Sequence, residues 1–274
     1  MVTWNRREYF ERTIAHLFSD STDFRIYIWD NGSQDGVRDL IADLKDDRIE
    51  LVHYNPDNGG QFGAWQWFMA NCKGDIVGKL DDDILGEPAW MRRFSEIIAD
   101  SPQIGVLGAW VYLKSEWDEV IARPKIVQIG PNSIFQNGWV PGGIFLGRRT
   151  IVSAYSSRDP STLGVPVDQL KIAKDGLING YPLPMSFAEH LDDPRSPYCR
   201  MNRAGGWDQF ASYTARMRKF SGPEEYGRWI AADARSVLET PLSVQISALS
   251  PSPFSRLKTK ISRKINSIRT STRT

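Results

Sequence analysis

This sequence has few of the features that indicate where a protein is located or that it binds a charged partner. Its 274 residues include two cysteines, too few for a disulfide framework or a cysteine-based metal cluster, so we expect a reducing compartment. The net charge of +1 provides no overall electrostatic basis for binding nucleic acid. The sequence has no run of about 18 apolar residues and no signal-peptide pattern at its start. These absences predict a cytoplasmic protein, soluble or peripheral on the membrane, with no nucleic-acid partner.

The chain does have enough apolar sequence for one sizeable core, since hydrophobic residues make up 41% of it. Helical spacing of apolar residues alternates with short β-rich runs. The pattern predicts helices at 7–19, 37–44, 60–72 and 88–99, strands at 25–29, 50–53, 76–80 and 105–109, and further short strands at 126–129, 133–135 and 140–146. This alternation predicts an α/β fold with a mostly parallel sheet and helices on both of its faces.

The most informative motif is Asp81-Asp82-Asp83, which directly follows the predicted strand at 76–80. Like charges this close repel each other unless a cation offsets them. Oxygen ligands select hard ions such as Mg²⁺ or Mn²⁺, and proteins commonly share Mg²⁺ with phosphate groups of a substrate. The motif therefore predicts a metal-bound phosphate ester, although a solvated turn that caps the next helix would have a similar composition.

Two further polar segments lie at the ends of predicted elements. They are Asp30-Asn31-Gly32-Ser33, after the strand at 25–29, and Asn58-Gly59-Gly60, before the helix at 60–72. In an open α/β sheet, ligands bind beyond the carboxyl ends of the strands. The acidic turns after the strands at 25–29 and 76–80 can therefore meet at one ligand. Backbone N–H groups at a helix start can receive a phosphate. Ordinary turn chemistry also accounts for these residue types.

The order and spacing of these motifs resemble those of the family 2 glycosyltransferases, which are inverting enzymes of the GT-A fold. The motifs are Thr3-Trp4-Asn5-Arg6, Asp30-Asn31-Gly32-Ser33-Gln34-Asp35, Asn58-Gly59-Gly60, Lys73-Gly74-Asp75 and Leu80-Asp81-Asp82-Asp83. The resemblance is firm over residues 1–108, extends over 139–184 and is absent beyond about residue 193. It implies a Rossmann-like nucleotide-binding half at 1–108 and a β-rich acceptor half at 109–230. A C-terminal helix, a linker and a basic tail would follow at 231–274.

The resemblance also implies an activity and a donor site. The chain would move a sugar from a nucleotide-sugar donor to a glycan or lipid-linked acceptor with inversion, as in polysaccharide biosynthesis. Asp30 would contact the base, Asp81 the ribose and Asp83 the divalent metal, Mn²⁺ or Mg²⁺, in a DXD-type motif. The remaining residues expected at the nucleotide sugar are Thr3, Asn5, Arg6, Asn31, Ser33, Asn58, Gly59, Gly60, Ala64 and Asp82.

On the acceptor side, the segment 139–149 resembles the family's acceptor loop, which implies contacts from Trp139, Gly142 and Gly143. Glycines let backbone lie against a sugar, and aromatic faces provide apolar platforms for it. Trp110 and Trp117 are further candidate platforms, although a tryptophan is more often a core residue.

Inverting transfer needs a base that removes the proton of the acceptor hydroxyl. Asp168 stands where the family places this base, but Val167 replaces the acid that usually precedes it. Asp168 would also suit the N-terminal turn of its own helix. His190 is expected as an additional ligand of the metal or the diphosphate, with Asp192 and Asp193 as competing acids.

The two ends of the sequence carry separate expectations. Met1-Val2-Thr3 is a stub where a strand of about six residues is usual, so either upstream residues complete this strand or the fold tolerates a short one. At the other end, 250–253 resembles a linker, and the basic segment after it predicts either an amphipathic helix on an anionic membrane or a disordered tail.

Two other functional classes share this kind of scaffold. A nucleotidyltransferase would be expected to open with a glycine-rich phosphate loop, and Trp4-Asn5-Arg6-Arg7 contains no glycine. A catalytically inactive sugar-nucleotide-binding or scaffolding protein remains an alternative, because Val167 weakens the base motif while the aspartate motif is intact. Donor hydrolysis that depends on Asp168 would separate an enzyme from a binder.

Overall fold

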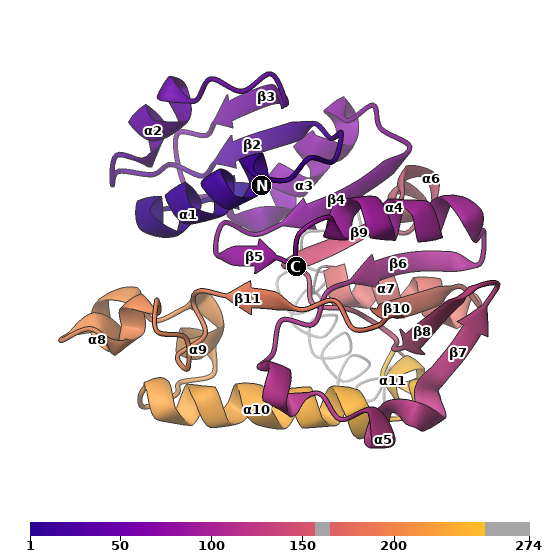
Figure 1. The fold of residues 1–274 in the computed structure, drawn as a ribbon. Coiled ribbons are helices and arrows are strands. Elements are labelled where there is room, and N and C mark those ends of the chain that lie inside the picture. Colours follow the sequence, from indigo (N-terminus) through magenta and orange to yellow (C-terminus); the bar gives the residue numbers. More distant parts are fainter. Residues whose placement is uncertain (157–164, 250–274) are drawn as a thin grey trace, which may run out of the picture.

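The computed structural model describes residues 1–156 and 165–249 (Figure 1). Its first half contains β1 (Val2–Thr3), α1 (Arg7–Phe18), β2 (Ile26–Asp30), α2 (Val37–Asp43), β3 (Ile49–Tyr54), α3 (Gly60–Asn71), β4 (Ile76–Leu80), β5 (Ile84–Gly86), α4 (Trp90–Asp100) and β6 (Ile104–Gly108). All four helices and all four strands predicted in this region are present, each with ends within about two residues of those expected. Apolar periodicity was therefore a sufficient guide here.

The second half is more irregular. It contains η1 (Lys114–Glu116), α5 (Glu119–Ala122), η2 (Arg123–Lys125), β7 (Ile126–Ile129), β8 (Asn132–Gln136), β9 (Ile144–Arg148), α6 (Arg149–Tyr155), α7 (Val165–Lys174), β10 (Ile178–Leu183), β11 (Ala188–His190), η3 (Arg200–Asn202), α8 (Gly206–Phe210), α9 (Tyr213–Met217), α10 (Pro223–Glu239) and α11 (Leu242–Ser247). The strand predicted at 140–146 was wrong at its start. The Val140 N–H donates to the Gln169 side chain at 2.7 Å, and the ladder of β9 begins at Ile144.

The strands form two larger sheets and one small one. The first has the order β1-β2-β3 and is parallel throughout, and the second has the order β4-β9-β6-β10-β8-β7. β4, β6 and β10 point the same way, with β9 antiparallel between β4 and β6. The third sheet pairs β5 with β11 antiparallel, so that Ile84 lies opposite His190. Helices cover both faces, which confirms the α/β class and the mostly parallel sheet (Figure 1).

Two large apolar clusters make up most of the core. One packs α1 and α4 on the first strands and includes the apolar face of α4, namely Trp90, Met91, Phe94, Ile97 and Ile98. The other joins the second half of the chain to α10, which runs along the lower edge of Figure 1. Trp110 is fully buried in it, with its ring centroid 5.4 Å from that of Trp117, so of the two interpretations open for Trp110 the core residue is confirmed. The expected boundary after residue 230 falls inside α10.

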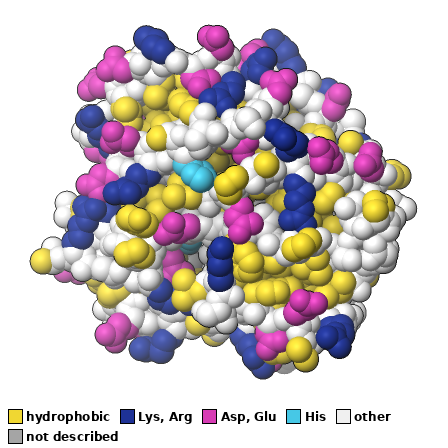
Figure 2. Space-filling model, in the orientation of Figure 1, with side chains coloured by type: hydrophobic (Ala, Val, Ile, Leu, Met, Phe, Trp, Pro, Cys, Tyr) yellow, Lys and Arg dark blue, Asp and Glu magenta, His cyan; other side chains and the backbone are white. Residues whose placement is uncertain are grey.

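The surface carries no dominant charge on the face that Figure 2 shows, where acidic and basic side chains are mixed with hydrophobic ones. Within 1–156 and 165–249, no helix has both the length and the apolar character needed to cross a bilayer. The expected linker at 250–253 and the basic tail after it lie outside the described residues.

Candidate active site

The three aspartates occupy the turn between β4 and β5, which places their carboxylates at the carboxyl end of β4. Asp82 and Asp83 are each only 4% exposed. The Asp82 carbonyl accepts a hydrogen bond from the Thr13 hydroxyl at 2.9 Å, which ties the turn to α1. The Asp81 N–H donates to the Gly143 carbonyl at 2.7 Å, which ties the turn to the loop before β9. The turn is therefore held from both sides of the molecule.

Arg6 is the centre of a buried ionic cluster. Its guanidinium donates to Asp83 through one nitrogen and to Asp192 through the other, the second bond being 2.8 Å long. The same group lies 3.6 Å from Asp82. The Tyr9 hydroxyl also donates to Asp192, at 3.0 Å. Burial alone would lower the pKa of Arg6, but the facing carboxylates raise it well above its usual value, so Arg6 stays charged.

The carboxylates respond differently to the same burial. Burial raises the pKa of Asp82 to about 7, although Arg6 opposes this. Burial acts in the same direction on Asp83, but Arg6 and then His190 outweigh it and hold the pKa of Asp83 well below its usual range. Burial would lower the pKa of His190, yet the Asp83 carboxylate, 3.5 Å from its Nε2, raises that pKa to about 9. Asp83 therefore stays ionised at a pH at which Asp82 takes up a proton.

The donor types in this cluster fit a hard divalent cation. Asp82 Oδ2 is buried and makes no hydrogen bond of normal length within the described part of the chain, and the Asp83 carboxylate lies beside the His190 imidazole, which can offer a nitrogen ligand once it has lost its proton. However, no set of three His, Cys, Asp or Glu side chains in 1–156 and 165–249 is arranged to hold a metal. Arg6 instead lies against Asp83. A metal that binds Asp83 would therefore have to displace or share this guanidinium.

The residues expected at the nucleotide are brought together at the ends of β2 and β3. The Asn31 side chain donates to Asn58 Oδ1 at 2.8 Å and to the Gly60 carbonyl at 3.1 Å, and it accepts the Gly59 N–H at 3.0 Å. This bonding joins the acidic turn to the glycine-rich loop. Asn58, Gly59 and Gly60 are exposed and can meet a ligand.

Asp30 and Ala64 are buried within the same region. The Asp30 carboxylate is fully buried and accepts bonds from Arg38 and from the Ser33 N–H, so its observed contacts shape the turn. Ala64 is 2% exposed on α3 and faces the interior. Arg38 also donates to the Asn55 carbonyl, which binds the turn to the end of β3.

The loop after β1 connects the two parts of the site. The Asn5 N–H donates to the Ser33 hydroxyl at 3.0 Å, and Asn5 Oδ1 accepts the Gln34 N–H at 2.7 Å. Asn5 has φ of 53°, in the left-handed region that asparagine tolerates better than most residues. This turn of the backbone sends Asn5 to the turn after β2 and Arg6 to the aspartates. Thr3, at 1% exposed, anchors the loop in the sheet.

The loop before β9, which was expected to contact the acceptor, lies directly against the aspartate motif. A Cβ on Gly143 would lie 2.4 Å from Ile84 Cδ1 and 3.0 Å from Asp81 Oδ2, so a larger residue here would push the ends of these two side chains aside. Lys79 pairs with Asp81 and donates to the Gly142 carbonyl at 3.1 Å. Trp139 is half-buried, and its carbonyl accepts the Asn137 amide at 2.7 Å.

Asp168 lies in the first turn of α7, four residues into the helix. It accepts a bond from Lys171 at 2.8 Å. Its neighbour Gln169 accepts the Val140 N–H, which places this end of α7 beside the loop before β9. The Lys171 pair and the first turn of a helix both suit a carboxylate at this position.

Sequence reasoning missed Tyr9 and Arg38, and it left Asp192 and Asp193 as equal alternatives. The structure separates these two acids, because Asp192 contacts Arg6 and Asp193 pairs with Arg195. In the sequence, the only sign of this part of the site was that Asp192 and Asp193 are both acidic. The Arg6–Asp192 contact itself joins residues that are 186 positions apart in the chain.

Comparisons with known proteins agree with this geometry. The family model described as glycosyl transferase family 2 matches residues 1–153. An uncharacterized glycosyltransferase of Nostoc sp. (strain PCC 7120) is 32% identical over 108 residues, which are 38% of this chain and 33% of that protein. The chondroitin synthase of Escherichia coli is 22% identical over 142 residues, or 49% of this chain and 21% of that protein. The chain thus spans a third or less of these curated relatives.

Solved structures show the same fold at low sequence identity. A mannosyltransferase from Pyrobaculum calidifontis in complex with GDP-Man and Mn²⁺ has a TM-score of 0.58 at 14% identity, over 96% of this chain and 78% of that one. TarS 1–349 of S. aureus in complex with UDP-GlcNAc has a TM-score of 0.54 at 13% identity, over 91% and 82%. These likenesses establish a GT-A fold. Because the family model covers more than half of the sequence, the chain belongs to glycosyl transferase family 2.

Proposed function

We propose that this chain transfers a sugar, with inversion, from a nucleotide-sugar donor to a hydroxyl group of a glycan or lipid-linked acceptor. The observation that carries the proposal is the position of the aspartate turn. It joins the buried Arg6 cluster on one side and the Gly142–Gly143 acceptor loop on the other. A donor diphosphate and an acceptor hydroxyl bound at these two places would meet beside one carboxylate-rich turn. The inactive binder is the alternative that experiments must separate.

The donor would be held at the carboxyl ends of β2, β3 and β4. The exposed residues 58–60 are available for the nucleotide, on a loop fixed by Asn31. Asp83 and His190 are the residues that would hold Mn²⁺ or Mg²⁺. When bound, such an ion supplies Lewis-acid neutralisation of the leaving diphosphate. Arg6 adds a permanent positive charge at the same place and orients Asp83 and Asp192.

Asp168 would take the proton from the acceptor hydroxyl as it attacks. Asp168→Asn keeps the size of the side chain but removes its basicity, so we expect the transfer rate to fall by roughly a hundredfold or more. Donor affinity should not change, because the predicted contact of Asp168 is with the acceptor. Release of nucleotide diphosphate, with and without acceptor, measures the rate.

The matched control is Asp175→Asn. Asp175 lies just beyond the C-terminal end of the same helix, and its carboxylate accepts a hydrogen bond from the Tyr155 hydroxyl at 2.7 Å. Asp175→Asn should leave the transfer rate unchanged. Full activity in Asp168→Asn would remove Asp168 from the mechanism. No release from the unaltered chain, with donor binding intact, would favour the inactive binder.

The donor class can be identified by thermal stability. A ligand that binds only the folded state at about a hundred times its Kd stabilises that state by about 2.7 kcal/mol. For a protein of this size we therefore expect the Tm to rise by about 5 °C or more with one class among UDP-, GDP- and dTDP-sugars. The rise should depend on Mn²⁺. Free sugars serve as controls, and folded protein that shows no shift with any donor would contradict the proposal.

We infer that the chain acts in polysaccharide biosynthesis, in the cytoplasm. We also infer that the basic segment after residue 253 contacts the membrane surface. A lipid-linked acceptor would be presented at such a surface. Fractionation of cells that express the full chain, compared with a chain ending at residue 249, tests the contact.

A further inference from the structure

The segment after β11 forms a small lobe at one edge of the molecule. We define the basic lobe as residues 200–219, which contain η3, α8 and α9. Figure 1 shows α8 and α9 beyond the sheets, near the start of α10. The lobe has five cationic side chains and one acidic side chain, namely Arg200, Arg203, Arg216, Arg218 and Lys219, and Asp208. This excess of positive charge distinguishes the lobe from the chain as a whole, whose net charge is +1.

Apolar side chains are also exposed on this lobe. Of the large apolar side chains in residues 1–156 and 165–249, the three most exposed are Tyr213 at 78%, Val120 at 73% and Met217 at 64%. Tyr213 and Met217 are four positions apart on α9, so they lie on the same face of that helix. Ala215, between them, is buried on the opposite face. Single exposed apolar residues are common, but two on one helix face form an apolar surface.

Side-chain contacts fix α9 in this orientation. The Ser212 hydroxyl caps the helix by accepting the Ala215 N–H at 3.1 Å, and it donates to the Tyr226 hydroxyl at 3.2 Å. Phe220, just after the helix, stacks on Tyr226, with ring centroids 5.5 Å apart. These contacts anchor α9 on the start of α10 and leave its apolar pair exposed.

The cations beside this apolar pair have no acidic partner. Arg216, Arg218 and Lys219 form no salt bridge in the part of the chain that the structure describes. Arg216 donates to two backbone carbonyls, at 2.9 and 3.1 Å. Arg218 lies over the Trp229 ring, 4.5 Å from its centroid. Neither contact sets a negative charge against the positive one, so this charge can attract an anionic partner.

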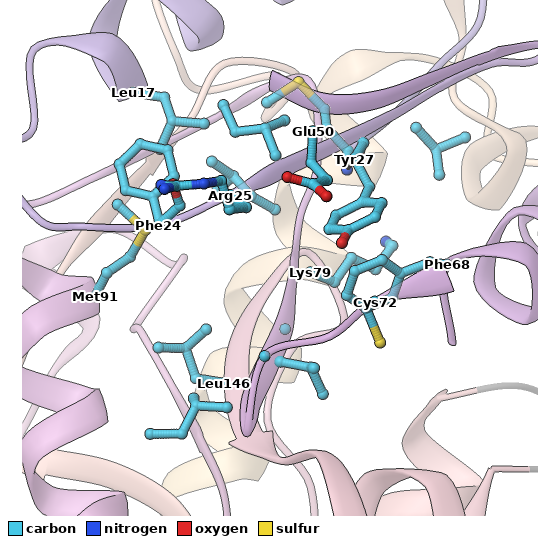
Figure 3. A pocket seen from close by; sticks show the side chains of 18 of the residues that line it. Leu17, Phe24, Arg25, Tyr27, Glu50, Phe68, Cys72, Lys79, Met91 and Leu146 are labelled. Atoms are coloured by element: carbon cyan, nitrogen blue, oxygen red, sulfur yellow. Dashed lines mark hydrogen bonds between the residues drawn. The ribbon is translucent and has the colours of Figure 1, made fainter. Parts of the chain in front are cut away.

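Other candidate surfaces lack this combination. Val120, on α5, follows Asp118 and Glu119, which an anionic partner would repel. The cavity in Figure 3, of about 550 Å³ beside β2 and β4, contains Arg25 and Glu50 among apolar side chains and so carries charges of both signs. In the basic lobe, by contrast, exposed apolar side chains and cations without acidic partners occur together.

We propose that the basic lobe docks on an anionic lipid bilayer, with the apolar pair of α9 among the headgroups and the flanking cations against lipid phosphates. Tyrosine is favoured at a membrane interface, where its ring is in apolar surroundings and its hydroxyl stays hydrated. Lysine and arginine are attracted by the negative surface potential of such a membrane. A soluble polyanion could pair with the cations but would leave the methionine in water, so the combination favours a lipid surface.

The basic lobe is also attached to the ionic cluster of the candidate active site. The Arg200 N–H donates to the Tyr9 hydroxyl at 2.8 Å, and that hydroxyl donates to Asp192. The Arg200 guanidinium lies over the rings of both Tyr9 and Phe210, 4.8 and 4.4 Å from their centroids. A docked lobe would hold the site close to the bilayer, where a lipid-linked acceptor is presented. This consequence rests on the proposed function, whereas docking itself needs no sugar transfer.

The first test measures binding of the full chain to phosphatidylglycerol and phosphatidylcholine vesicles, without a sugar donor. We expect at least about tenfold tighter binding to the anionic vesicles, with a smaller difference at high salt. Tyr213→Ser combined with Met217→Ser should weaken this binding at least about tenfold, and Arg218→Gln combined with Lys219→Gln should do the same. Val120→Ser is the matched control and should bind like the unaltered chain. All these side chains are exposed, so the Tm of each variant should not change.

The second test separates the basic lobe from the basic segment after residue 253, which could bind anionic lipid by itself. Cys72 and Cys199 are buried, so the new cysteine in Met217→Cys can be labelled with a dye that brightens in apolar surroundings. The dye should brighten when phosphatidylglycerol vesicles are added. The same dye at Ala42→Cys should not respond, because that position is exposed on α2, which lies far from α9 in Figure 1.

A dye at residue 217 that does not respond to anionic vesicles would overturn the proposal, because any lipid contact would then lie elsewhere in the chain. Tighter binding to single-stranded DNA than to anionic vesicles would also overturn it, because the partner would then be a nucleic acid. A chain that docks as expected but transfers no sugar would support the docking and contradict the proposed function.

Discussion

Replacing Asp83 by asparagine should lower the rate of sugar transfer by at least about a hundredfold, with most of the folding stability retained. The Asp83 carboxylate is the one that Arg6 and His190 keep ionised, and it is the expected metal ligand. Asparagine preserves the shape but removes the charge. Arg6 would still pair with Asp192, so the guanidinium would not be left alone.

Two measurements separate this outcome from simple unfolding. The Mn²⁺-dependent rise in Tm with the donor should disappear in Asp83→Asn, and the circular dichroism spectrum without ligand should be unchanged. Asp75→Asn is the matched control, because Asp75 precedes the same strand and its side chain is fully exposed. Equal donor affinity in Asp83→Asn and in the unaltered chain would show that Asp83 does not bind the metal-linked donor.

Arg6→Gln should be the most destabilising single substitution in the site, at about 3–5 kcal/mol of unfolding free energy at neutral pH. Asp82, Asp83 and Asp192 are each no more than 4% exposed, and Arg6 is the cation that contacts them all. Glutamine leaves these buried carboxylates without that charge. Urea denaturation measures the loss, and a divalent ion that binds Asp83 should restore part of it.

Arg203→Gln is the control for loss of an arginine. Arg203 pairs with Glu8 on the surface, where both side chains are about half exposed, so its loss should cost less than about 1 kcal/mol. The double variant Arg6→Gln with Asp83→Asn should lose less stability than the sum of the two single variants, because the second change removes a charge that the first leaves unpaired. An Arg6→Gln protein as stable as Arg203→Gln would show that the cluster does not depend on the guanidinium.

Much of the first half of the chain could be predicted because its signals are local. The apolar stripe of α4 repeats within about one turn, and the apolar run of β4 ends at the aspartates within the same few residues. The turn after β2 and the glycine-rich loop were also recognised by composition. Their joining through Asn31 was not, because it depends on how β2 and β3 lie side by side.

The second half was predicted less well because its interactions are remote. β5 and β11 have three residues each, too few for a periodic signal, and their partners are about a hundred positions apart. Their pairing places His190 beside Asp83. Trp110 illustrates the same limit, since composition cannot distinguish a sugar platform from a core residue, and burial against Tyr181 decided for the core.

By itself the sequence determined the α/β class, the order of the elements and the turns that carry the polar side chains, because these depend on residues within a few positions of one another. Tertiary structure alone decided which of those side chains meet. The Arg6–Asp83 contact spans 77 positions and the Arg6–Asp192 contact spans 186. Such contacts follow from the packing of whole elements, whose relative positions no local pattern specifies.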